Sequence, residues 1–276
     1  NLRPVFFSLV QLLKELQVPT TWALVSSLLA KSESDINIEH LPTSYRDSVR
    51  KFYRESDMPT HCGLDLVDVL GTIDSLVEIA SHTSTHIYAE QKDITSRQYV
   101  DDVRESILVL ESYFKRSIKS LVFPRDQAKF NNEIAKEFPL NFRLNPSYGE
   151  KKTKIGRIVS GGSRIFTMPP CSKIIIGQYG ESYQTGSLYF NWSGGSYERI
   201  KKVLTQKQTN RLLTNMEDGA IYHVWLHPFN LAESTDHFSQ FGKFIRELAV
   251  LRDKGLLEII MMSDVKNDLN EINLNG

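Results

Sequence analysis

The fold is decided by residues 77–86, which read Val77-Glu78-Ile79-Ala80-Ser81-His82-Thr83-Ser84-Thr85-His86. The first four residues are mainly apolar and include two β-branched side chains, as expected of a short buried strand. The six that follow are small, polar or histidine, which is typical of a tight loop just past the end of a strand. A segment with apolar residues at helical spacing, 99–114, comes next. The stretch therefore predicts one strand, one loop and one helix in succession.

The same alternation of helix and strand extends in both directions along the chain. Periodicity predicts helices over 4–16, 99–114, 132–138, 196–216 and 236–254, and strands over 20–25, 77–80, 120–123, 142–144, 174–176, 220–226 and 256–262. Several of these strands are continuous apolar runs, which favour a parallel sheet covered by helices. We predict an α/β fold, in the form of an irregular barrel with polar residues gathered at the rim where its strands end.

The composition narrows the class of protein. At 276 residues the chain is long enough for one sizeable domain over 1–276. Its 33 basic and 33 acidic residues leave no net charge, which disfavours nucleic acid or an anionic membrane as partner. Cys62 and Cys171 lack the spacing of a cysteine metal site or a disulfide framework. No apolar run reaches the roughly 20 residues of a transmembrane segment, and no export signal is visible, so we expect a cytoplasmic location.

Two imidazoles, His82 and His86, stand four residues apart in the loop after the predicted strand 77–80. Nitrogen ligands of one zinc-like ion each lie roughly 2.1 Å from it, whereas an extended strand would separate the two residues by about 13 Å. The loop must therefore curl into a turn if both rings are to bind one ion. The residues alone leave two interpretations open: a divalent metal site, or two loop histidines bonded to backbone groups.

Two more predicted strands end in polar residues. Arg125 and Asp126 follow the strand 120–123, and the guanidinium could clamp a carboxylate of a ligand or form a salt bridge with Asp126. His227 ends the strand 220–226, which makes it a functional candidate at the rim. His223 points the same way one or two layers deeper, so we expect it in the core.

The order of these motifs resembles that of the polysaccharide deacetylases with NodB homology, also called carbohydrate esterase family 4. Residues 78–86 match the family's His-(Ser/Thr)-x-x-His metal motif together with its preceding strand. Residues 123–125, Phe-Pro-Arg, resemble the Arg/Pro motif in a variant order, and residues 224–227, Val-Trp-Leu-His, resemble the Leu-x-His motif. The resemblance covers most of the chain and implies a single deacetylase-like domain over 1–276.

The resemblance implies a metal-dependent hydrolase that removes an N-acetyl group from a sugar, in a distorted (β/α) barrel. A divalent metal, with zinc as the first choice, would be held by His82 and His86 and would activate water. His227 would protonate the departing amine, and Arg125 would orient the base. Trp225, Asp126 and Trp192 would contact the N-acetylated carbohydrate.

The departures from the family's pattern define the alternatives. The Asp-Asp pair on the family's first strand, which supplies the base and the third metal ligand, is absent, and we expect it and that strand before Asn1. A non-catalytic relative that binds carbohydrate, and a different metal-dependent amidohydrolase on a barrel, are the two alternative functions.

Overall fold

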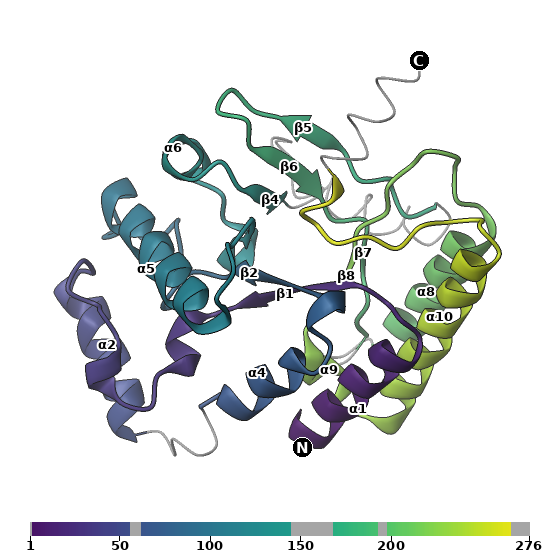
Figure 1. The fold of residues 1–276 in the computed structure, drawn as a ribbon, viewed down its shortest axis with the longest axis horizontal. Helices are drawn as coiled ribbons and strands as arrows, with labels where there is room; N and C mark the ends of the chain where they lie inside the picture. The colour runs from purple at the N-terminus through teal and green to yellow at the C-terminus, as the bar shows by residue number, and fades with distance from the viewer. Residues whose placement is uncertain (1, 56–61, 145–167, 193–197, 266–276) are drawn as a thin grey trace. The chain divides into compact units, whose positions relative to one another are not determined.

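The computed structural model describes residues 2–55, 62–144, 168–192 and 198–265 (Figure 1). Contacts within the chain divide it into two compact units, each assembled from segments that are distant in the sequence. The sheet unit comprises Pro19–Leu144, Ile175–Tyr183 and Ile260–Gly276, and the helical unit comprises Asn1–Val18, Asn145–Ile174 and Gln184–Ile259. The single domain over 1–276 stays a prediction. The segment 147–163, which the sequence marks as a polar loop, lies outside the described residues.

The sheet unit is built on a six-stranded sheet with the strand order β1-β2-β3-β4-β6-β5 (Figure 1). The strands are β1 Thr20–Leu24, β2 Val77–Ser81, β3 Ser120–Val122, β4 Asn141–Leu144, β5 Ile174–Ile176 and β6 Ser182–Thr185. The pairs β1–β2, β2–β3 and β3–β4 are parallel. The predicted α/β class with a largely parallel sheet is thus confirmed. Over the described ranges the sheet is open, with β1 and β5 at its edges, and no closed barrel is formed.

Strand β2 lies inside this sheet, and all five of its residues are buried. Its carboxylate, Glu78, accepts hydrogen bonds from Thr21 Oγ1 at 2.6 Å, from the Ser120 hydroxyl, and from the backbone N–H of Ser263 at 3.1 Å. A buried carboxylate is tolerated only when such partners replace water. Glu78 therefore joins β1, β2 and β3 as a structural group.

Several helices and 3-10 turns in the described part of the chain accompany the sheet. They are α2 Thr43–Glu55, α4 Leu64–Gly71, α5 Ser96–Phe114, α6 Asn131–Glu137, η1 Ser26–Leu29, η2 Glu33–Asp35, η3 Asp74–Leu76 and η4 Pro124–Asp126. Helix α5, predicted from its apolar period, packs on β2 and buries that stripe. It begins at a capping box between Thr95 and Gln98, which satisfies two N–H groups at the helix start. It ends at Lys115 in the left-handed conformation.

The helical unit contains α1 Leu2–Glu15, α8 Glu198–Thr214, α9 Pro228–Leu231 and α10 Thr235–Asp253, with the short strands β7 Leu188–Tyr189 and β8 Val224–Trp225. Helix α1 contacts α9, and α10 contacts both α9 and α8. Its aromatic core includes Phe190, which packs on Phe241 and Phe244 at ring-centroid distances of 5.0 and 6.0 Å. None of the helices in the described ranges combines the length and apolar character that a membrane span requires.

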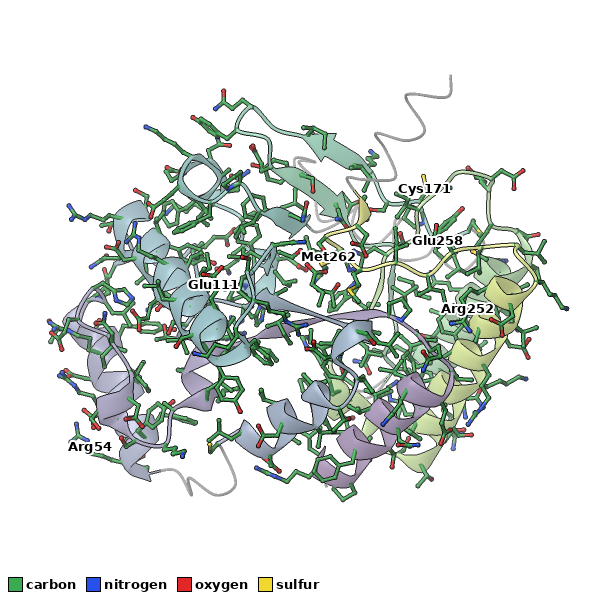
Figure 2. All side chains as sticks on the ribbon, viewed as in Figure 1. Arg54, Glu111, Cys171, Arg252, Glu258 and Met262 are labelled. Carbon is green, nitrogen blue, oxygen red and sulfur yellow. The ribbon has the colours of Figure 1, made fainter. Side chains whose placement is uncertain are left out.

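One predicted strand is wrong in extent, and another is absent from the described residues. Of the strand 220–226, only Val224–Trp225 pairs, because its partner β7 is just two residues long. The strand 256–262 does not form; the backbone N–H of Met262, labelled in Figure 2, donates to the side-chain hydroxyl of Thr21 on β1 at 3.0 Å. An apolar run becomes a strand only where a neighbouring backbone supplies its partners. The prediction also missed α2 and α4.

Candidate functional site

The loops after β2 and β3 share an unusual backbone. Thr83, His86, Arg125 and Asp126 have φ values of 65°, 58°, 53° and 56°. They are four of the six non-glycine residues with positive φ in the described chain. The left-handed conformation costs a non-glycine residue roughly 1–2 kcal/mol, and such residues gather at functional sites. The clustering marks the rim formed by these two loops as a candidate site.

The loop 82–86, which we call the histidine loop, is fixed to the end of β1 and to η1 by backbone hydrogen bonds. The N–H of His82 donates to the carbonyl of Leu24 at 2.8 Å, which prolongs the β1–β2 pairing. The N–H groups of Ser26 and Ser27 donate to the carbonyls of Thr83 and Ser84 at 3.3 and 3.0 Å. The loop is therefore held at a fixed place just beyond the sheet.

The Asp102 carboxylate of α5 holds the same loop from the side. It is fully buried and accepts from the N–H groups of Ser84 and Thr85 at 3.0 and 3.2 Å and from the Thr85 hydroxyl at 3.0 Å. The imidazole Nε2 of His40 lies 3.1 Å from Asp102 Oδ1, the oxygen that also accepts from the Thr85 hydroxyl. Burial raises the pKa of the Tyr45 phenol, and the nearby Asp102 carboxylate raises it further, so this hydroxyl stays protonated beside the loop at neutral pH.

The rings of His82 and His86 lie close together, with their centroids 4.9 Å apart and their planes at 60°. His82 Nδ1 lies 2.6 Å from the carbonyl oxygen of Val122, so Nδ1 carries the proton and donates it to this carbonyl. This bond fixes the orientation of the ring. Within the described ranges, however, no group of three His, Cys, Asp or Glu residues could hold a metal ion. The zinc site that the sequence predicted is therefore not supported.

Tyr88 joins the two loops into one surface. The His86 ring packs against it at a centroid distance of 5.4 Å, and the Arg125 guanidinium lies over its face at 4.2 Å. A guanidinium at this distance from an aromatic face is held by cation–π attraction. Arg125 is exposed, so its donors face solvent from a fixed position. We name these four side chains, His82, His86, Tyr88 and Arg125, the rim cluster.

Asp126 forms an ion pair with Arg143, a residue that was not predicted as part of the site. Arg143 Nη2 donates to Asp126 Oδ1 at 2.7 Å, and the two side chains are 6% and 18% exposed. The salt bridge that the sequence offered between Arg125 and Asp126 is thus replaced by one to β4. In the sequence, Arg143 stands out as a charged residue between the apolar residues of the predicted strand 142–144, and this pattern could have marked it as a site residue. No comparable pattern in the sequence marks Tyr88 or Asp102.

The remaining predicted residues belong to the helical unit. His227 is exposed and stacks on Phe229 at 5.1 Å, while Trp225 stacks on Tyr189 at 4.0 Å and lies edge-on to His227 at 5.7 Å. The predicted pairing of His227 with the histidine loop spans the two units and stays a prediction. Trp192 is 2% exposed and stacks on His237 at 3.9 Å, so its ring is part of the interior and offers no face to a sugar.

No family model matches the chain, and no curated protein matches it either. Among solved structures it is similar to a GH57-type branching enzyme from the hyperthermophilic archaeon Pyrococcus horikoshii, with a TM-score of 0.53 and 10% identity, over 96% of this chain and 64% of that one. A GH57 branching enzyme from Thermococcus kodakaraensis gives 0.48 at 11% identity, covering 95% and 64%. The α-amylase AmyC from Thermotoga maritima gives 0.35 at 10%, covering 67% and 41%.

The similarity to the Pyrococcus horikoshii enzyme corrects the sequence-based identification. The fold is that of the Pyrococcus horikoshii branching enzyme, of whose length this chain spans 64%, which is less than two thirds. The assignment to the polysaccharide deacetylases is wrong, and so is the N-deacetylase activity on a linear amide. The non-catalytic deacetylase relative and the metal-dependent amidohydrolase are no better supported. Three short motifs matched a family pattern, but local spacing does not determine the fold in which the motifs stand.

Proposed function

We propose that this chain is a carbohydrate-active protein that binds a glycan at the rim cluster and acts on its glycosidic bonds. One observation carries the proposal: four left-handed non-glycine residues concentrate in the two loops that present an imidazole pair, a phenol ring, a guanidinium and a carboxylate. Support for the substrate class comes from the fold shared with a branching enzyme. We also propose that the parallel sheet forms the larger part of an irregular barrel.

The rim cluster suits a sugar chemically. A sugar ring has an apolar face that packs on aromatic rings and hydroxyl groups that bond to charged side chains. Tyr88 supplies the ring, and Arg125 supplies up to five N–H donors in a planar fork beside it. Because Arg125 is already ordered on Tyr88, little conformational entropy is lost when it binds a hydroxyl group.

Breaking a glycosidic bond requires two carboxyl groups, one to protonate the leaving oxygen and one to act as nucleophile or base. Asp126 is our candidate for one of them, because it stands beside the rim cluster and Arg143 fixes its orientation. Glu78 and Asp102 are fully engaged in structural hydrogen bonds and are set aside. The proposal therefore assigns Asp126 to catalysis and Arg125 to binding.

The test is turnover of soluble glucans, followed by the release of reducing ends and by the formation of branch points. Asp126→Asn should lower the rate by about 10²–10⁴-fold, the range for a catalytic acid or base. Arg125→Ala should weaken glycan binding and leave the fold intact, because its side chain is exposed. Arg97→Ala is the matched control, since Arg97 is 91% exposed on α5 and its partner Asp101 is 3.9 Å away.

Three results contradict the proposal. The first is the absence of glycan binding and turnover in the wild-type chain. The second is a rate for Asp126→Asn equal to that of the wild type. The third is an equal loss of binding in Arg125→Ala and Arg97→Ala, which would trace the effect to surface charge rather than to the rim cluster.

A further inference from the structure

A cavity in the sheet unit is lined by none of the four side chains of the rim cluster. It has a volume of about 640 Å³ and lies between the segment 26–36, Leu64 of α4 and one face of α5. The α5 residues that line it are spaced as i, i+3, i+4, i+7 and i+8, which places them on one helical face: Glu105, Leu108, Val109, Ser112 and Tyr113. Its volume is within the range of about 300–1,000 Å³ that small-molecule sites occupy.

The floor of the cavity carries a buried hydroxyl group with a proton to donate. Ser26 and Ser84 line the cavity and are each 1% exposed. Ser26 Oγ donates to Ser84 Oγ at 3.1 Å. Across the described residues, the Ser84 hydroxyl accepts this hydrogen bond, and no acceptor is found for its own proton. Because a buried donor without an acceptor is costly, a ligand oxygen at this position is the natural partner.

The walls combine carboxylates with an apolar surface. Two acidic residues, Asp35 and Glu105, and one basic residue, Lys31, line the cavity, so the lining carries a net negative charge. Asp35 Oδ2 accepts from two backbone N–H groups at 2.9 and 3.0 Å, which orients its carboxylate. Leu108, 57% exposed, and Tyr113, 39% exposed, form the apolar wall.

The Tyr113 ring is held in place on this wall. Its hydroxyl donates to Asp68 Oδ1 at 2.7 Å, and its ring packs edge-on against Phe114 at 5.1 Å. A ligand that fits this lining has hydroxyl groups for the carboxylates, an oxygen for Ser84 and an apolar face for Leu108 and Tyr113. It carries no negative charge, because the carboxylates would repel an anion.

We propose that this cavity binds a neutral sugar of one or two residues, at a site separate from the rim cluster. The proposal goes beyond the proposed function, since it concerns a second site that does not require glycosidic chemistry. Ser84 lies between His82 and His86 in the same loop, so a ligand bonded to Ser84 perturbs the imidazole resonances of both residues. The cavity is thus a position from which a small sugar acts on the histidine loop.

The experiment is calorimetric titration of the whole chain with glucose, maltose and gluconate, in an Arg125→Ala background that removes the rim cluster's contribution. Leu108→Trp fills the cavity from an exposed helical position and should weaken glucose binding at least tenfold. Glu105→Gln removes a charged acceptor and should weaken it about tenfold, as expected for a hydrogen bond to a charged group. Val250→Trp, at a 46% exposed position of α10, is the matched control and should bind glucose as the background does.

Three outcomes overturn the proposal: no glucose or maltose binding in the Arg125→Ala background, equal binding by Leu108→Trp and Val250→Trp, or tighter binding of gluconate than of glucose. The failure of the proposed function looks different. In that case glycan turnover is absent or insensitive to Asp126→Asn, while glucose binding still responds to Leu108→Trp. Histidine resonances of residues 82 and 86 that do not move on saturation with glucose refute the link to the histidine loop.

Discussion

Removing the Asp102 carboxylate should destabilise the sheet unit strongly, and the contacts allow the size of the effect to be worked out. Asp102→Ala leaves the N–H groups of Ser84 and Thr85 without their acceptor, and both donors are in a loop where Ser84 is 1% exposed. Each buried donor left unpaired costs about 1–3 kcal/mol. With the Thr85 hydroxyl and His40 also losing a partner, we expect a loss of about 4–6 kcal/mol.

Asp102→Asn should cost less, for a specific reason. The amide oxygen can still accept from the two backbone N–H groups, and the amide nitrogen can donate to the Thr85 hydroxyl and to His40, both of which can accept. What is lost is the strengthening that the negative charge gives to the two backbone bonds, about 1 kcal/mol each. We therefore expect Asp102→Asn to cost about 2 kcal/mol.

Asp101 is the matched control, since it precedes Asp102 on the same helix. Its side chain is 25% exposed and its partners are Arg97 and Arg104 at the surface. Surface ion pairs contribute about 0–1 kcal/mol, so Asp101→Ala and Asp101→Asn should stay within that range. Urea unfolding at pH 7 measures all four variants, and hydrogen exchange at the Ser84 and Thr85 amides localises the effect. Equal midpoints for Asp102→Ala and Asp101→Ala would refute the reasoning.

Three further predictions concern the interior. Phe142→Ala should cost about 3–5 kcal/mol, because the ring is fully buried in a stack with Phe123 and Tyr183; urea unfolding that shows under 1 kcal/mol would contradict it. Gly177→Ala should be destabilising, since the added Cβ would lie 1.9 Å from the Glu181 carboxylate. Gly71→Ala, at the end of α4, adds a Cβ with nothing within 4 Å and should be neutral or stabilising by up to about 1 kcal/mol. Thermal midpoints in the reverse order would disprove this. Burial lowers the pKa of His237 below its usual 6.5, with Glu233 offsetting part of the effect. The unfolded state therefore binds more protons, so the stabilising contribution is full above pH 6.5 and falls as the pH drops below it. Urea unfolding from pH 5 to 7 should show a shallower dependence of the unfolding free energy on pH for His237→Phe than for the wild type. An unchanged dependence would count against the argument.

Local elements follow from the sequence to a large extent. The apolar period of 99–114 places α5, Ser96–Phe114, within a few residues, because helix formation depends on side chains three and four positions apart. The strand 77–80 and the curled loop after it were also predicted, since a short apolar run followed by small polar residues leaves the backbone few alternatives. The strand at 256–262 failed for the opposite reason, because a strand depends on a partner from elsewhere in the chain.

The candidate site followed from the sequence only in part. His82 and His86 lie together as predicted, because four residues of curled backbone bring two side chains to one side. The third group of the expected metal site, and the family itself, depend on which distant segments meet, and a five-residue motif carries no information about that.

The pattern of residues thus accounts for the α/β class, for the strand β2 and the helix α5 that follows it, and for the position of the histidine loop between them. Three-dimensional packing accounts for the ion pair of Asp126 with Arg143, 17 residues away, for the hydrogen bonds between Asp102 and the histidine loop, and for the burial of Trp192. The physical reason is the range of the interactions. Periodicity and capping act over one or two helical turns, whereas a side chain's partners are set by strand register and by the contact of elements far apart in the chain.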